Sequence, residues 1–105
     1  MDLITSTSNP LIKQARALRQ KKARSESGLF LVEGIHHVGE VIAAGWEVET
    51  VIYAPQLLTS AFARDLLDRA SHLKLQAVSP AVIETLTDVA ANRFITVTEG
   101  EGTLK

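Results

Sequence analysis

Six basic side chains lie in the first quarter of the chain, and their chemistry is the most clearly defined in the sequence. Residues 1–24 hold these six against one acidic residue, whereas residues 25–105 hold five basic and eleven acidic residues. Lysine and arginine bind phosphate groups through charge, and arginine also through paired donors. This segregation of charge suggests a surface that faces a polyanion. The six residues, called the basic arm below, are Lys13, Arg16, Arg19, Lys21, Lys22 and Arg24.

Charge alone leaves a second interpretation of the basic arm open, that of a solvated helix face with a frayed end. The chain as a whole has a net charge of −1 and 46% hydrophobic residues, enough for one modest core. It has no cysteine and no apolar run long enough to cross a bilayer. We therefore expect a single cytoplasmic domain with no membrane association.

Recognisable catalytic and cofactor motifs are missing from these 105 residues. The sequence contains no GxGxxG, GxxxxGK[ST], HExxH or GxSxG pattern. His36 and His37 are adjacent, so on a helix their side chains would diverge by about 100° and suit joint metal ligation poorly. We expect no catalytic residue and no metal site in this chain.

For two further polar residues, Asn9 and Glu33, a structural role is the first interpretation. Asn9 precedes Pro10 and is expected to cap a helix. Glu33 stands between an apolar run and Gly34, where a strand gives way to a helix. Its carboxylate could accept N–H groups from the first turn of that helix, or it could pair with an arginine of the basic arm and orient it. Both roles are more consistent with the sequence than general-base catalysis.

The pattern of apolar residues predicts which elements carry these side chains. A basic helix is expected over residues 9–24, ending near Lys21 and Lys22 and followed by a turn over residues 25–28. Its core-facing residues would be Leu11, Ala15 and Leu18. Further helices are predicted over residues 35–44 and 60–70, with a short one from residue 79. Strands are predicted over residues 29–32, 47–53, 73–78 and 94–97.

This alternation predicts an α/β fold, a three-layer α/β/α sandwich around a four-stranded sheet. The sheet should be mostly parallel or mixed, with a last strand that could run antiparallel at an edge. Aromatic residues are few and most fall in strands or on predicted buried stripes, as Phe62 does. That argues against binding of single strands by stacking and favours recognition of the shape and backbone of folded RNA.

A set of dispersed residues with consistent spacing resembles the N-terminal substrate-binding domain of SpoU-type RNA 2′-O-ribose methyltransferases. The resemblance is dense from residue 4 to about residue 53 and covers the chain more thinly after that. Residues 91–93 are a departure, because the family tends to have Pro-Gln-Gly where this chain has Ala91-Asn92-Arg93. The matching residues are Ile4-x-Ser6, Asn9-Pro10, Lys13, Leu18, Lys21-Lys22-x-Arg24 and Gly28-x-Phe30-x-Val32-Glu33-Gly34, before a helix that ends at Gly45.

The resemblance implies a fold like that of kink-turn-binding ribosomal proteins and a role in presenting ribosomal or transfer RNA to a separate catalytic domain. In the family that second domain binds S-adenosylmethionine and usually forms the dimer, and its motifs are not found here. We therefore expect residues 1–98 to be the RNA substrate-binding domain, residues 99–105 to begin a linker, and the chain to be an excised part of a homodimeric enzyme. The chain itself should bind no cofactor.

By the same analogy, the turn and helix start at Gly34, Ile35 and His36 should lie near structured RNA, with the basic arm on the phosphates. Asn9 and Glu33 would then be structural or orienting residues. Two alternatives stay open at this point. One is a stand-alone RNA-binding or ribosome-associated module of the same fold, and the other is a small α/β protein-interaction domain with a solvated basic segment.

Overall fold

The structure, a computed structural model, describes residues 3–88 and 94–100. The departure at Ala91-Asn92-Arg93 and most of the predicted linker lie outside these ranges. Within them the chain alternates helices and strands, and each strand predicted from the sequence is present. The elements are α1 (Pro10–Ala17), α2 (Lys21–Ser27), β1 (Leu29–Glu33), α3 (Ile35–Ala43), β2 (Val48–Tyr53), the 3₁₀ helix η1 (Pro55–Leu57), α4 (Ala61–Arg69), β3 (Leu75–Ala77), α5 (Pro80–Glu84) and β4 (Phe94–Glu99).

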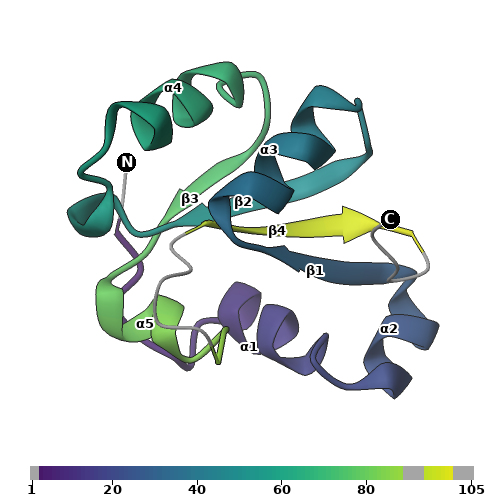
Figure 1. Cartoon of the computed structure of the whole chain (residues 1–105). Coiled ribbons are helices and arrows are strands. Elements are labelled where there is room, and N and C mark those ends of the chain that lie inside the picture. Colours follow the sequence, from purple (N-terminus) through teal and green to yellow (C-terminus); the bar gives the residue numbers. More distant parts are fainter. Residues whose placement is uncertain (1–2, 89–93, 101–105) are drawn as a thin grey trace.

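The four strands form one sheet with helices on both faces. Figure 1 shows α3 and α4 above the sheet and α1, α2 and α5 below it. Each face has its own apolar core. Under α1 and α5 the core is built around Ile12, Ile52, Ile83 and Ile95, and under α3 and α4 around Val38, Val51, Leu66 and Phe94. The predicted three-layer α/β/α sandwich is confirmed.

The strand order is β1-β4-β2-β3, with β4 antiparallel to both of its neighbours. Only β2 and β3 pair in parallel, so the expectation of a largely parallel sheet was wrong and the mixed alternative is correct. The last strand does run antiparallel, but it lies in the centre of the sheet rather than at an edge.

The predicted basic helix over residues 9–24 is in fact two helices. Helix α1 ends at Ala17, and α2 runs from Lys21 to Ser27, so the turn expected over residues 25–28 was wrong apart from Gly28, which ends α2 in the left-handed conformation. A continuous helix would have rotated Lys21 and Lys22 toward the apolar stripe. The break after the buried Leu18 leaves both lysines exposed.

The ends of α1 are fixed by local contacts and by burial. Asn9 Oδ1 accepts the backbone N–H of Leu11 at 2.9 Å, which is the capping geometry expected at Asn9-Pro10. Ile12, Ala15 and Leu18 are buried, whereas Leu11 is half-buried, so the core-facing stripe begins one residue later than predicted. The basic residues of α1 therefore sit on a helix held firmly against the sheet.

One edge of the sheet collects the ends of three strands and the start of the fourth. The N–H of Gly34, directly after β1, donates to the carbonyl of Phe94 at 3.0 Å, and Tyr53 at the end of β2 pairs with Phe94 as well. Helix α3 and the η1–α4 connection start from this edge, and Ser60 caps α4. Ligands of open α/β sheets commonly bind at the edge formed by the strand ends.

We expect Gly34→Ala to lower the free energy of unfolding by about 1–3 kcal/mol, because Gly34 has φ 95° and ψ 145°, a region close to one that only glycine adopts readily. Urea denaturation followed by circular dichroism measures this loss. Gly39→Ala is the matched control, since Gly39 lies inside α3 and a Cβ there would meet Leu66 at an ordinary 3.8 Å. It should be stabilising by about 0.5–1 kcal/mol, and equal losses in both variants would contradict the account of Gly34.

Candidate functional site

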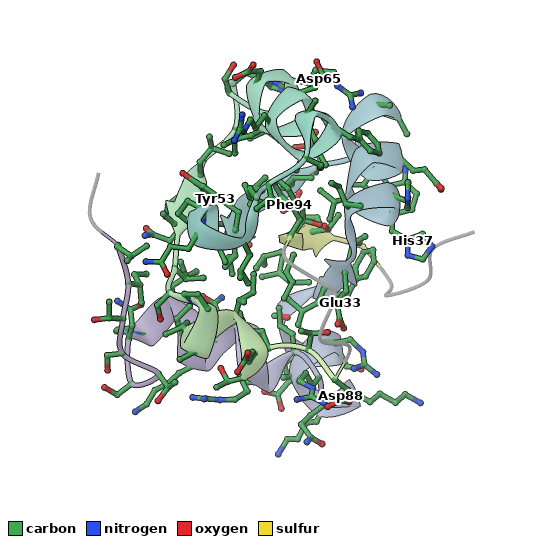
Figure 2. All side chains as sticks on the ribbon, turned by 60° about the vertical axis from the view of Figure 1, so that its left-hand side comes forward. Glu33, His37, Tyr53, Asp65, Asp88 and Phe94 are labelled. Atoms are coloured by element: carbon green, nitrogen blue, oxygen red, sulfur yellow. The ribbon has the colours of Figure 1, made fainter. Side chains whose placement is uncertain are left out.

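A hollow of about 310 Å³ opens beside β1, below the Gly34 turn. It is walled by the α1–α2 junction, by β1 and by the segment that follows α5. Figure 2 shows Glu33 and Asp88 on this same side of the molecule. We call it the arginine pocket. Its lining residues are Leu18, Arg19, Arg24, Phe30, Leu31, Glu33 and Asp88.

Arg24 enters the pocket from α2 with its guanidinium already oriented. Its Nη1 donates to the carbonyl oxygen of Leu18 at 3.0 Å, across the break between α1 and α2. Leu18 is itself buried, so this carbonyl is a fixed acceptor. A guanidinium carries five N–H donors in a rigid fork, and this contact uses one nitrogen. The helix break therefore positions the arginine.

Arg19 enters from the α1–α2 connection and pairs with Asp88, which lies 69 residues away in the sequence. The Nη2 and Oδ2 atoms are 2.5 Å apart, and the Asp88 side chain is 84% exposed. Exposed ion pairs contribute at most about 1 kcal/mol, since water and salt screen them. An anion of higher charge can therefore compete with Asp88 for Arg19. Sequence patterns gave no sign of Asp88, because the contact depends on how α5 packs beside α1.

Glu33 faces the arginine pocket from the end of β1. The N-cap residue of α3 is Gly34, which has no side chain to cap the helix. The side chain of Glu33 lines the pocket together with Arg19 and Arg24. Both roles that the sequence left open for Glu33, acceptance of N–H groups from α3 and pairing with an arginine of the basic arm, stay predictions.

The other members of the basic arm lie outside the pocket, on the same two helices. Arg16 donates from Nη2 to the carbonyl of Thr7 at 2.9 Å and so ties α1 to the preceding segment. Lys22 lies 3.9 Å from Glu26 with 87% of its side chain exposed. Lys13 and Lys21 are also exposed. Each of the three arginines of the arm thus makes a contact within the protein, two of the three line the pocket, and the three lysines are exposed.

Gly34 separates the arginine pocket from a second, apolar pocket of about 160 Å³ on the α3–α4 side of the sheet. Glu33 lines the first pocket and Ile35, two residues on, lines the second. His36 lies at the rim, where its ring contacts that of Phe62 with centroids 5.4 Å apart. Gly34, Ile35 and His36 therefore lie at the edge of the sheet, directly after Glu33, which lines the arginine pocket with Arg19 and Arg24.

One aromatic residue lies where the sequence did not predict it. Phe62, expected on the buried stripe of α4, is 43% exposed. Trp46, which follows α3, is 36% exposed. The stripe of α4 is formed by Ala63, Leu66 and Ala70, a spacing that the sequence permits equally well.

The described residues hold no group of three histidine or acidic side chains that could bind a metal ion. None of their helices is long and apolar enough to span a bilayer. The polar groups that do converge are arginines and carboxylates. The two guanidinium groups could bind an anionic ligand through charge and paired donors, in competition with the two carboxylates.

Comparison with known proteins identifies the domain. A family model for the MRM3-like substrate-binding domain matches residues 9–92, so the chain belongs to that family. It is 33% identical over 97 residues to an uncharacterized tRNA/rRNA methyltransferase of Synechocystis, and the match covers 80% of this chain and 35% of that protein. The SpoU-type substrate-binding domain predicted from the sequence is confirmed.

Solved structures agree with this assignment. A crystal structure of an RNA 2′-O ribose methyltransferase superposes with a TM-score of 0.81 at 29% identity, covering 99% of this chain and 40% of that one. An rRNA methyltransferase from Sinorhizobium meliloti gives 0.73 at 29% identity, covering 93% and 36%. A SpoU methyltransferase from Streptomyces viridochromogenes in complex with AdoMet gives 0.72 at 27% identity, covering 88% and 33%. The chain spans about a third of the length of these proteins.

Proposed function

We propose that this domain binds structured ribosomal or transfer RNA and positions it for ribose 2′-O-methylation by a separate catalytic domain. The observation that carries the proposal is the convergence of Arg19 and Arg24 on one pocket beside the Gly34 turn, in a domain whose family is defined by substrate binding. The chain performs no catalysis in this proposal. The named relatives supply the reaction type and the RNA classes.

The remaining parts of the proposal concern the longer protein. We propose that residues 1–98 are the RNA-binding unit and that a linker begins at residue 99, which is the last residue of β4. S-adenosylmethionine would bind the catalytic domain, as AdoMet binds the relatives from Sinorhizobium and Streptomyces. That domain would also form the homodimer, and the enzyme would act in the cytoplasm on its RNA substrate.

Phosphate recognition follows from the charges of the basic arm. Arg19 and Arg24 line the same pocket, and each guanidinium group offers paired donors, which suit phosphate oxygens. Lys13, Lys21 and Lys22 extend positive charge along the same layer and release counterions when RNA binds. Contacts of this kind position a protein on the backbone without reading the bases. Binding by the isolated domain should therefore be weak and strongly dependent on salt.

Reversing two lysines of the arm tests this role. We expect Lys13→Glu with Lys22→Glu to weaken binding to a fluorescein-labelled transfer RNA and to reduce the slope of log K against log salt by about 2. Fluorescence anisotropy between low and moderate salt gives both values. Arg69→Glu with Lys74→Glu changes the net charge equally at the opposite end of the sheet, and it should leave the slope nearly unchanged. Equal effects in the two pairs would contradict a localised phosphate surface.

The contact between Arg19 and Asp88 generates a second expectation. Asp88→Asn removes the carboxylate that competes with phosphate, so affinity for the same RNA should rise about two- to fivefold, the equivalent of one exposed ion pair. The free energy of unfolding should change by less than about 1 kcal/mol. Asp65→Asn is the matched control, because Asp65 also pairs with an arginine but on α4. An unchanged or lower affinity of Asp88→Asn would show that Arg19 does not contact phosphate.

A further inference from the structure

The apolar pocket on the far side of the Gly34 turn is a second recess at the same edge of the sheet. Its floor is Phe94 and its walls come from the start of α3 and from the η1–α4 connection. Two hydroxyl residues, Thr59 and Ser60, line it among otherwise apolar side chains. Its lining residues are Ile35, Leu57, Leu58, Thr59, Ser60, Ala63 and Phe94.

An exposed pair of rings stands at the rim of this pocket. Phe62 precedes the lining residue Ala63, and His36 follows the lining residue Ile35, so both rings are one residue from the pocket. The rings are tilted by 45° with centroids 5.4 Å apart. Phe62 is 43% exposed although it is a large apolar side chain. An exposed aromatic beside an apolar recess offers a stacking surface for a planar group.

We propose that the apolar pocket takes one unpaired nucleobase of the bound RNA, with the rings of Phe62 and His36 stacking against that base or its neighbour. The inference rests on the proposed RNA-binding function and adds a base-binding subsite to it. Sequence-specific recognition of RNA uses unstacked bases that stack on aromatic side chains and bond through their edges. Such a subsite goes beyond the backbone and shape recognition expected from the sequence.

The dimensions and position of the pocket favour this ligand. At about 160 Å³ it is smaller than the roughly 300–1,000 Å³ of pockets that hold drug-sized ligands or cofactors. Ile35 is two residues from Glu33, so the backbones lining the two pockets are at most about 7 Å apart. One RNA lying across the Gly34 turn therefore reaches both the arginine pocket and the apolar pocket.

The rim supplies polar groups for the edge of a base. Ser60 Oγ accepts the N–H of Ala63 at 3.1 Å, so the oxygen is held in place while its own hydrogen is available to donate. Thr59 is exposed and adds a second hydroxyl. These groups suit the carbonyl and ring-nitrogen acceptors of a nucleobase. An apolar side chain of a protein partner would form no hydrogen bonds with these two hydroxyl groups.

The test compares two labelled RNA hairpins with the same stem, one carrying a three-adenosine bulge and one fully paired. Fluorescence anisotropy with the 105-residue chain should show a preference of about tenfold for the bulged RNA, within the range for one aromatic stacking contact. Phe62→Ala should bring the two affinities within about twofold of each other, whereas Phe62→Tyr should keep the preference. Trp46→Ala removes the other exposed aromatic and should also keep it.

Methyl NMR of the unmodified chain locates the base. The methyl resonances of Ile35, Leu57 and Leu58 should shift with the bulged hairpin and stay in place with the paired one. If both RNAs bind equally and these methyls do not move, the base pocket is wrong while the RNA-binding function stands. If neither RNA binds, the proposed function is wrong and the subsite with it. Shifts that depend on protein concentration without RNA would assign the pocket to a protein contact instead.

Discussion

The hydrogen bond from the N–H of Gly34 to the carbonyl of Phe94 holds the Gly34 turn in position, and both pockets of the site adjoin this turn. It joins the end of β1 to the start of β4, two points 60 residues apart in the chain, and Gly34 turns there with a positive φ. The residue before the turn faces the arginine pocket and the residue after it faces the apolar pocket. A single backbone position therefore sets two binding surfaces side by side.

The central strand β4 is buried on both faces, which makes the edge of the sheet at the Gly34 turn rigid. Phe94 to Thr98 in β4 are all buried, and Thr96 and Thr98 bond to each other at 2.8 Å inside the core. Such a strand is stable only between two others, with a helix layer on each side. The basic arm is attached to this frame through Ile12, Ala15 and Leu18. The basic residues of α1 are consequently held against the sheet, and the bond from Arg24 to the Leu18 carbonyl ties α2 to the same frame.

Local patterns in the sequence were enough to predict the elements and their caps. The strands, the α/β/α layers, the cap at Asn9 and the turn at Gly45 follow from periodicity and from residues with strong backbone preferences. Contacts between residues far apart in the sequence could not be predicted from such local patterns. The central place of β4, the pairing of Arg19 with Asp88 and the exposure of Phe62 all depend on how separate elements pack. The break between α1 and α2 was predicted only in part. The sequence indicated that the first helix would end near Lys21 and Lys22. It did not indicate that a new helix would begin there.

Backbone amide chemical-shift mapping of the 105-residue chain with a structured transfer RNA would show directly which surface of the domain binds RNA. The largest shifts should fall in residues 19–24 and 33–36, on both sides of the Gly34 turn. Residues 69–74, at the opposite end of the sheet, should be nearly unaffected. Shifts concentrated in residues 69–74, with the arginine pocket and the Gly34 turn unchanged, would contradict this placement of the RNA-binding surface.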